Sequence, residues 1–312
     1  MTAAAASTSE RLVLLAKDIK LSHSVFALPF ALLAGFMAAA SQGEMLSLEA
    51  LGLLVLCMVL ARTVAMTMNR WADRYLDGLN PRTAQRAIPS GQLDDRFVLN
   101  TAIACALSFV IAAGGFYFAS DGNLWPLILS PVAMLWLVSY SFTKRFTWLC
   151  HLFLGVALAI SPAAAAIAIA PQYLAEPGPY VLAFMVMCWV AGFDIIYAMQ
   201  DTEVDRSMGI HSIPARLGDA AAMWISRLLH ASALAALIGL CQLDESLGPG
   251  FAVGTACVAA LLALEHTLVW RSKTHHIHVA FFVVNGAISL LLGALGIIDV
   301  MLYLAGSPAN PR

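Results

Sequence analysis

Leu48 to Asp77 of this chain read LEALGLLVLCMVLARTVAMTMNRWADRYLD. Residues 48–69 of this stretch carry only two charged side chains, Glu49 and Arg62, and about 20 apolar residues suffice for a helix to cross a bilayer. The stretch then ends in a polar cluster that runs from Asn69 to Asp77. Its pattern predicts a transmembrane helix that carries acidic side chains where it leaves the membrane.

Similar apolar stretches recur along the whole chain. Of the 312 residues, 61% are hydrophobic and 12% are charged, and the mean hydropathy is +0.81, which is far outside the range of soluble domains. Residues 1–312 are therefore predicted to form one all-α integral membrane domain with nine transmembrane helices. The spans are expected at 22–41, 48–69, 97–119, 124–142, 146–170, 180–199, 219–241, 249–270 and 279–305.

Residues 1–20 precede the first span and are predicted to form an interfacial segment. Glu10 to Lys20 have the pattern of a short amphipathic helix that lies on the membrane surface. The side chains expected to face lipid are Leu12, Leu14, Leu15 and Ile19.

Basic residues are distributed unevenly between the connections. The N-terminus and the even-numbered connections carry nearly all Lys and Arg, whereas the odd-numbered connections 42–47, 120–123, 171–179 and 242–248 carry none. The positive-inside rule therefore places the N-terminus in the cytoplasm and the C-terminus outside. It also places the polar cluster after residue 69 on the cytoplasmic side. The protein is expected in the inner or plasma membrane of the cell.

A second acidic cluster lies on the same side of the membrane, after the sixth span. Asn69, Asp73 and Asp77 recur every four residues, and Asp194, Tyr197, Asp201 and Asp205 follow at i, i+3, i+7 and i+11, so each set predicts one stripe on a helix. Each cluster is followed by a basic loop that contains proline. Two similar halves that face each other would bring both clusters to one central cavity.

Two facing stripes of oxygen atoms are suited to Mg²⁺, which is typically held by one or two carboxylates together with phosphate oxygens of a substrate. We therefore predict Mg²⁺ as cofactor and a pyrophosphate as ligand. An alternative is a solvated helix end whose acids pair with nearby arginines. The basic side chains available to neutralise phosphate are Arg70, Arg74, Arg82, Arg86, Lys144 and Arg206.

These motifs together resemble a known family. NxxxDxxxD from Asn69, the loop Asn80-Pro81-Arg82-Thr83 with Arg86, and DxxYxxQDxxxD from Asp194 are similar to the intramembrane aromatic prenyltransferases typified by 4-hydroxybenzoate polyprenyltransferase. The segment Tyr140-Ser141-Phe142-Thr143-Lys144-Arg145 resembles the tyrosine-containing lysine-arginine segment of that family. The resemblance covers nearly the whole chain.

The resemblance implies nine helices around a central cavity with a cytoplasmic-side active site, and Mg²⁺-dependent transfer of a polyprenyl group to an aromatic ring. It implies a polyprenyl diphosphate and a small aromatic acceptor as partners within the lipid bilayer, and no nucleic acid. The implied Mg²⁺-side residues are Asn69, Asp73, Asp77, Asp201 and Asp205. The implied pyrophosphate contacts are Arg82, Arg86 and Lys144, to which the basic clusters add Arg70 and the resembling segment adds Tyr140.

Two residues deeper in the spans are further candidates. Asp194 lies about two turns deeper than Asp201, and we expect it to orient the acceptor or take its proton. Tyr197 and Lys144 are the other two residues expected to act in catalysis. A hydrogen-bond partner for Tyr197 or another span is the alternative for Asp194. Arg62 lies on the same stripe as Asn69, and an arginine at this depth needs a partner. That partner is either the carboxylate of an acceptor or a structural acid such as Asp194.

The acceptor is expected to be of the 4-hydroxybenzoate type used in ubiquinone synthesis. The segments 19–29 and 80–83 also resemble the menaquinone branch that proceeds through futalosine, so a naphthoate-type acceptor is the alternative. A secondary transporter is an alternative of another class. It would place charged groups near the bilayer midplane, whereas most acids of this chain lie at helix ends on one side.

Overall fold

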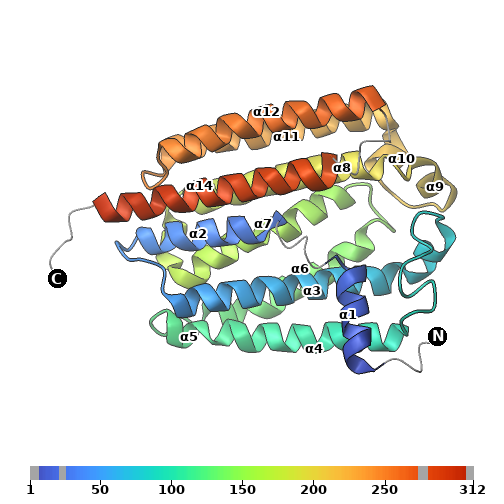
Figure 1. Cartoon of the computed structure of the whole chain (residues 1–312), viewed down its shortest axis with the longest axis horizontal. Coiled ribbons are helices and arrows are strands. Elements are labelled where there is room, and N and C mark those ends of the chain that lie inside the picture. The colour runs from blue at the N-terminus through green and yellow to red at the C-terminus, as the bar shows by residue number, and fades with distance from the viewer. Residues whose placement is uncertain (1–6, 21–25, 273–279, 307–312) are drawn as a thin grey trace.

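The computed structural model describes residues 7–20, 26–272 and 280–306, and these residues form helices and no strands. Most helices run side by side along the longest axis of the molecule (Figure 1). The exception among the longer ones is α1 (Thr8–Asp18), which crosses the others at one end. This arrangement confirms the predicted all-α membrane fold.

The helices follow one another with short connections. Along the first half of the chain they are α2 (Leu28–Ala40), α3 (Leu48–Leu79), α4 (Asp95–Gly114), α5 (Phe116–Ala119), α6 (Trp125–Thr143), α7 (Cys150–Ile169) and η2 (Pro171–Ala175). The second half contains α8 (Gly178–Ala198), α9 (Thr202–Ser207), α10 (Ile213–Leu217), α11 (Asp219–Leu243), α12 (Pro249–Ser272), η3 (Ala280–Val284) and α14 (Asn285–Gly306).

Eight helical stretches in the described part of the chain are long and apolar enough to cross a membrane. The ninth expected span, 22–41, corresponds to α2, which has 13 residues, and part of that span lies outside the described residues. The count of nine transmembrane helices therefore stays a prediction.

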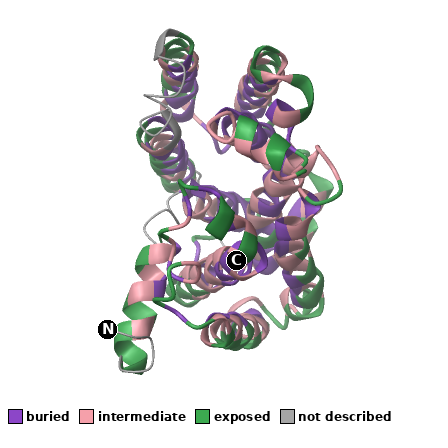
Figure 2. Ribbon diagram, turned by 90° about the vertical axis from the view of Figure 1, so that its right-hand side faces the viewer, coloured by how far each residue is buried: buried purple, intermediate pink, exposed green. Residues whose placement is uncertain are grey.

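Helix α8 is the most enclosed of the spans, and it packs chiefly against α7 and α11. Glycines permit this close approach. A Cβ atom on Gly155 of α7 would lie 2.5 Å from the carbonyl oxygen of Met187, and one on Gly192 of α8 would lie 2.3 Å from Cδ2 of His230. The end-on view shows buried residues on the faces that helices turn toward one another (Figure 2). Tight packing around α8 fixes the position of its polar end.

The length of α3 explains how one acidic cluster leaves the apolar region. Its 32 residues span about 48 Å, which exceeds a hydrocarbon core of about 30 Å. The helix ends at Leu79 because Asn80 takes an extended conformation ahead of Pro81. The end of α3, the end of α8, and helices α9 and α10 lie at the same end of the bundle (Figure 1).

Helix α1 differs from its expected orientation. Leu15 and Ile19 are 3% and 1% exposed and pack with Leu93 and Val98, so the prediction that they face lipid was wrong. They are buried because α1 docks on the loop after α3 and on the start of α4. Leu12 is 45% exposed and is still available to a membrane surface.

Candidate active site

The first acidic cluster has the predicted geometry. Asn69, Asp73 and Asp77 follow one another at single-turn spacing on α3, and the two aspartates are only 1% and 6% exposed. One oxygen of Asp73 accepts a hydrogen bond from Lys144 Nζ at 2.5 Å and another from Asn69 at 3.3 Å. Its other oxygen lies 3.3 Å from Arg145. Two cations at the end of α6 therefore hold the middle acid of the stripe.

The loop after α3 folds back onto this cluster. Arg86 Nη1 lies 2.7 Å from both carboxylate oxygens of Asp77, and the Thr83 hydroxyl donates to the Asp77 carbonyl at 3.0 Å. The side-chain oxygen of Asn80 accepts the backbone N–H of Arg82 at 2.9 Å, which is an Asx turn. Local hydrogen bonds thus fix the conformation of the segment that carries both arginines.

The second cluster is not one continuous stripe. Helix α8 ends at Ala198, its last turn closes with backbone bonds from i to i+3, and Asp201 is the N-cap of the separate helix α9. The prediction that Asp194, Tyr197, Asp201 and Asp205 share one helix face was therefore wrong. The chain turns at this break, and Asp201 faces the loop after α3.

Arg82 joins the two clusters. Its guanidinium donates to both carboxylate oxygens of Asp201, at 2.9 and 2.5 Å, and to the Tyr197 hydroxyl at 3.0 Å. Asn80 donates a further hydrogen bond to Asp201 at 3.0 Å. Burial opposes ionisation of this carboxyl, but the hydrogen bonds from Arg82 and Asn80 prevail and lower its pKa. The end of α3 and the end of α8 are therefore in direct contact through a charged group.

Lys144 lies between the clusters as well. It is paired with Asp73, and its charge is close enough to Asp205 to act on the pKa of that carboxyl. Burial and the neighbouring carboxylate of Asp201 together raise the pKa of Asp205 to about 6, against the hydrogen bond from Ser212, which lowers it. Asp205 forms no ion pair within the described part of the chain. The acids of both clusters thus share one set of cations.

Asp194 lies on α8, before the break, and contacts His151, a residue that the sequence did not single out. Its carboxylate lies 2.7 Å from Nδ1 of His151 on α7. The backbone N–H of Ile213 donates to Nε2 of His151 at 3.3 Å, so Nε2 is the unprotonated nitrogen and the neutral ring donates from Nδ1. This contact matches the alternative in which Asp194 bonds to another span, and its catalytic role stays a prediction.

Two of the predicted pyrophosphate contacts have protein partners of their own. Arg70 is 7% exposed, and it donates to the carboxylate and the backbone carbonyl of Asp18, each at 3.2 Å. The Tyr140 hydroxyl donates to the Ala65 carbonyl at 3.4 Å and so links α6 to α3. In this structure Arg70 anchors α1, and Tyr140 supports the helix that carries the first cluster.

Arg62 lacks the structural acid that was one of the two partners expected for it. Its buried Nε has no hydrogen-bond partner among the described residues, and no ion pair of Arg62 occurs there. Asp194, the acid proposed as an alternative partner, is bonded to His151 instead. Arg62 thus holds a buried donor that is free to bind a ligand.

Sequence reasoning assigned no site role to three residues that hold this site together, which are Asp18, Arg145 and His151. Asp18 lies in a segment expected on the membrane surface, and its carboxylate accepts both Arg70 and the backbone N–H of Ala87 at 3.0 Å. His151 lies at the start of an apolar span. The presence of an ionisable residue in such a span is the one feature of the sequence that could have indicated a role for it.

The donor set fits Mg²⁺, although it is not a ready-made metal centre. Within residues 7–20, 26–272 and 280–306, no three acidic, His or Cys side chains converge as they would in a protein-only metal site. Mg²⁺ needs only one or two carboxylates when a substrate supplies phosphate oxygens, and all five predicted ligands offer oxygen. Asp73, Asp77 and Asp201 already hold a cationic group, which shows that each accepts positive charge at this depth.

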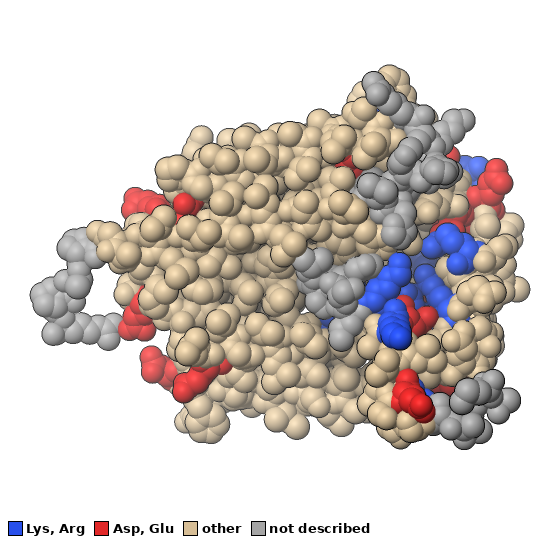
Figure 3. Space-filling view, in the orientation of Figure 1, with Lys and Arg blue, Asp and Glu red and all other residues tan. Residues whose placement is uncertain are grey.

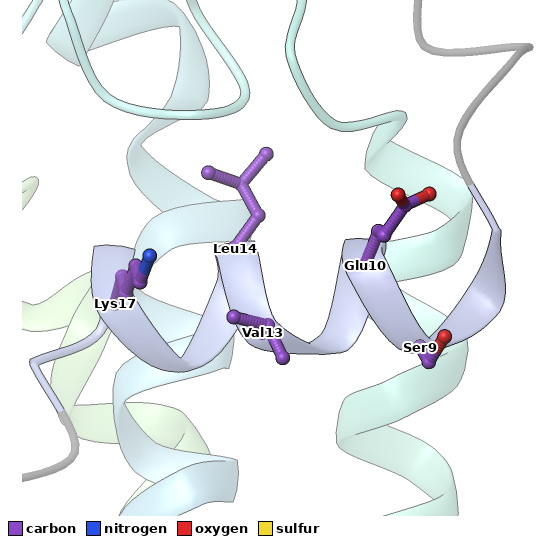
Figure 4. Close-up of a pocket in the computed structure, with 5 residues that line it drawn as sticks. All are labelled: Ser9, Glu10, Val13, Leu14 and Lys17. Carbon is purple, nitrogen blue, oxygen red and sulfur yellow. The ribbon is translucent and has the colours of Figure 1, made fainter.

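Charged side chains gather at this end of the molecule. The space-filling view shows Lys and Arg grouped around Asp and Glu at the end where α9 and α10 lie (Figure 3). Two hollows described in the structure are elsewhere. One is lined by Ser9, Glu10, Val13, Leu14 and Lys17, all of α1 (Figure 4), and one of about 620 Å³ lies between the connections at the opposite end. Neither is lined by the predicted site residues, so the central cavity stays a prediction.

The acids and bases at one end of this membrane bundle, supplied by α3, the start of α9 and the connections after α3 and α6, are typical of intramembrane enzymes that act on charged head groups of lipid-soluble substrates. This chain belongs to the UbiA prenyltransferase family, whose model matches residues 27–297.

Known relatives agree with the family. The chain is 32% identical over 216 residues to a 4-hydroxybenzoate octaprenyltransferase of Vibrio cholerae, covering 69% of this chain and 70% of that enzyme. It is 31% identical over 225 residues to the enzyme of the same name from Pseudomonas syringae, covering 70% and 71% of the two chains.

Solved structures confirm the fold. The apo structure of a UbiA homolog from Aeropyrum pernix matches 89% of this chain and 98% of its own, with a TM-score of 0.80 and 30% identity. A UbiA homolog from Archaeoglobus fulgidus, bound to DMAPP and Mg²⁺, matches 92% of this chain and 99% of its own, with a TM-score of 0.69 and 18% identity.

Proposed function

We propose that this chain transfers a polyprenyl group from a polyprenyl diphosphate to a ring carbon of 4-hydroxybenzoate, in the synthesis of ubiquinone, and that it requires Mg²⁺. The observation that carries the proposal is the contact of Arg82 with Asp201 and Tyr197, since it joins the two acidic clusters at one end of the bundle. The names of the relatives in Vibrio and Pseudomonas support this acceptor.

The charges of the site suit a diphosphate. Mg²⁺ would be held by Asn69, Asp73, Asp77, Asp201 and Asp205. When bound, the metal would stabilise the negative charge that develops on a departing pyrophosphate. Arg82, Arg86 and Lys144 now bind carboxylates, and each can transfer its hydrogen bonds to phosphate oxygens. Arg70 contributes indirectly, because it fixes α1 beside the site.

The proposed reaction breaks the allylic C–O bond of the diphosphate and forms a C–C bond to the acceptor ring. The allylic C–O bond breaks, and both of its electrons leave with the pyrophosphate. The ring of the acceptor supplies the electron pair of the new C–C bond, and the ring proton must then be removed. The carboxylate of Asp194 is the proposed base, with the neutral His151 ring holding one of its oxygens through Nδ1–H. Arg62 binds the carboxylate of the acceptor with its free donor.

The membrane setting follows from the same arrangement. We propose that the site opens to the cytoplasm, with the N-terminus on that side and the protein in the cell membrane, because the basic residues cluster at the end where the acids lie. The isoprenoid tail can then stay in the hydrocarbon while its diphosphate reaches the polar end of the bundle.

The test is product formation by the purified protein in lipid. Labelled polyprenyl diphosphate, Mg²⁺ and 4-hydroxybenzoate should yield pyrophosphate and an apolar prenylated acid. A parallel reaction with a dihydroxynaphthoate-type acceptor decides between the two branches. Faster turnover of the naphthoate would reassign the acceptor, and no transfer to either would overturn the proposal.

A further inference from the structure

Five basic side chains around the two acidic clusters are paired with acids, whereas Lys20, near them, is not. Arg70 pairs with Asp18, Arg82 with Asp201, Arg86 with Asp77, and Lys144 and Arg145 with Asp73. Lys20 forms no ion pair within the described residues. The segments that the structure does not describe, 1–6, 21–25, 273–279 and 307–312, contain no Asp or Glu side chain. No aspartate or glutamate of this protein therefore neutralises Lys20.

Lys20 lies at the site and not on a remote surface. Its Nζ is 4.5 Å from the centroid of the Phe282 ring, and that ring is 6.3 Å from the ring of Tyr197. Tyr197 in turn accepts the hydrogen bond from Arg82 that joins the clusters. The ammonium is thus held at an aromatic face one ring away from Arg82.

Lys20 has an unusual backbone conformation. Lys20 follows the C-cap of α1 and has a φ of 49°, in the left-handed region that glycine usually occupies at this position. A residue with a side chain is disfavoured in that conformation. A glycine would serve the turn at least as well, so the turn alone does not call for a lysine.

The surrounding charges point to an anion as the missing partner. Lys20 is exposed, but the protein around its ammonium desolvates it in part, and this effect and the neighbouring charges of Arg70, Arg86 and Arg82 lower its pKa. An anion that binds among these cations relieves their mutual repulsion. The arginines in question include two that the proposed function assigns to the diphosphate, Arg82 and Arg86.

We propose that Lys20 is a further diphosphate-binding residue, supplied by the N-terminal segment and available to the substrate because no aspartate or glutamate pairs with it. This inference rests on the proposed function. It adds a residue that follows α1 to a substrate site whose other diphosphate contacts, Arg82, Arg86 and Lys144, lie in the connections after α3 and α6.

The test compares variants that separate charge from backbone. Lys20→Gly suits the left-handed conformation and should leave the melting temperature unchanged or higher, whereas its affinity for a prenyl thiolodiphosphate, a slowly reacting analogue, should fall about 10-fold. Lys20→Arg keeps the charge and should stay within about threefold of wild type. Lys17→Ala, which removes an exposed lysine one turn earlier on α1, is the matched control and should bind normally.

Two outcomes would overturn the inference. One is an unchanged analogue affinity in Lys20→Gly, and the other is a raised KM for the aromatic acceptor with an unchanged KM for the diphosphate. Either result would leave the proposed function intact as long as wild type forms the prenylated product. Absence of product with wild type would instead refute the proposed function.

Discussion

Several basic side chains at the site have two roles, because the groups that pair with the acids are also the groups proposed to bind the phosphates of the substrate. Arg82 shows this most clearly, since one guanidinium contacts Asp201 and Tyr197 at once. Such a charge is held in place by the protein and yet can exchange one anion for another. The acids of both clusters would then be free for a divalent cation at the moment the substrate binds.

Arg62 is the residue whose substitution separates acceptor binding from diphosphate binding. Arg62→Ala should raise the KM for the aromatic acid about 10-fold or more, because a charge-assisted hydrogen bond is lost, and should leave the KM for the diphosphate unchanged. Thr63→Ala is the control, since the Thr63 hydroxyl donates to the Val59 carbonyl of its own helix. An unchanged acceptor KM in Arg62→Ala would rule out the acceptor role.

Asp194 tests the proposed base. Asp194→Asn keeps the size of the side chain but removes the proton acceptor, so kcat should fall by about 10² to 10⁴ while the affinity for the diphosphate analogue is retained. Asp244→Asn is the matched control, because Asp244 is also a half-buried acid bonded to a neighbouring side chain, Tyr173, but lies at the other end of the bundle. A kcat of Asp194→Asn near that of the control would contradict the role.

Among the elements, α3 and α8 differ in how far their sequences predict them. The stripe on α3 follows from a helix that continues unbroken to Leu79, so the spacing of Asn69, Asp73 and Asp77 was enough. The end of α8 has no proline or glycine to mark its stop at Ala198, and its turn depends on contacts with the α3–α4 loop. The spacing of residues along the sequence predicts a shared helix face only where the helix continues without a break.

Side-chain partners were the least predictable part of the site. The pairing of Asp194 with His151 joins residues 43 apart in the chain, and that of Arg70 with Asp18 joins residues 52 apart. No local pattern contains such pairs, because they arise from the packing of α7 on α8 and of α1 on the α3–α4 loop. The sequence therefore predicted which residue types gather at this end, and packing decided their partners.

Helix packing around α8 gives a prediction on stability. Gly192→Ala should destabilise the bundle by about 1–3 kcal/mol, because the added Cβ would lie 2.3 Å from the His230 ring. Gly239→Ala adds the same atom to α11 where nothing lies within 4 Å, and it should be neutral or stabilising. Thermal unfolding in detergent measures both, and equal melting temperatures would contradict the packing described here.

The whole molecule is polarised between its two ends. In the space-filling view, Lys and Arg gather at one end, and only Asp and Glu are visible among charged residues at the other (Figure 3). One acid at the acidic end caps a helix. Asp299 accepts hydrogen bonds from the backbone N–H groups of Gly248 and Phe251, at 2.9 and 2.6 Å, at the start of α12. This asymmetry is what the positive-inside rule uses to orient a membrane protein.

The orientation is testable with a reporter enzyme that is active only outside the cytoplasm. Fusion after Glu245, in the connection between α11 and α12, should give an active reporter. Fusion after Met208, just beyond α9, should give an inactive one, because the basic end stays inside. The reverse pattern would place the acidic clusters on the wrong side for cytoplasmic substrates.

The central claim is that both acidic clusters act on one diphosphate through divalent cations. The most direct measurement is a double-mutant cycle on the affinity for a prenyl thiolodiphosphate, with Asp73→Asn, Asp201→Asn and their combination, each with Mg²⁺ and with a chelator. If the clusters act together, each single variant should lose nearly as much Mg²⁺-dependent affinity as the double variant, and chelation should weaken wild type to the same level. Strictly additive losses, or binding by wild type that does not depend on Mg²⁺, would contradict the account.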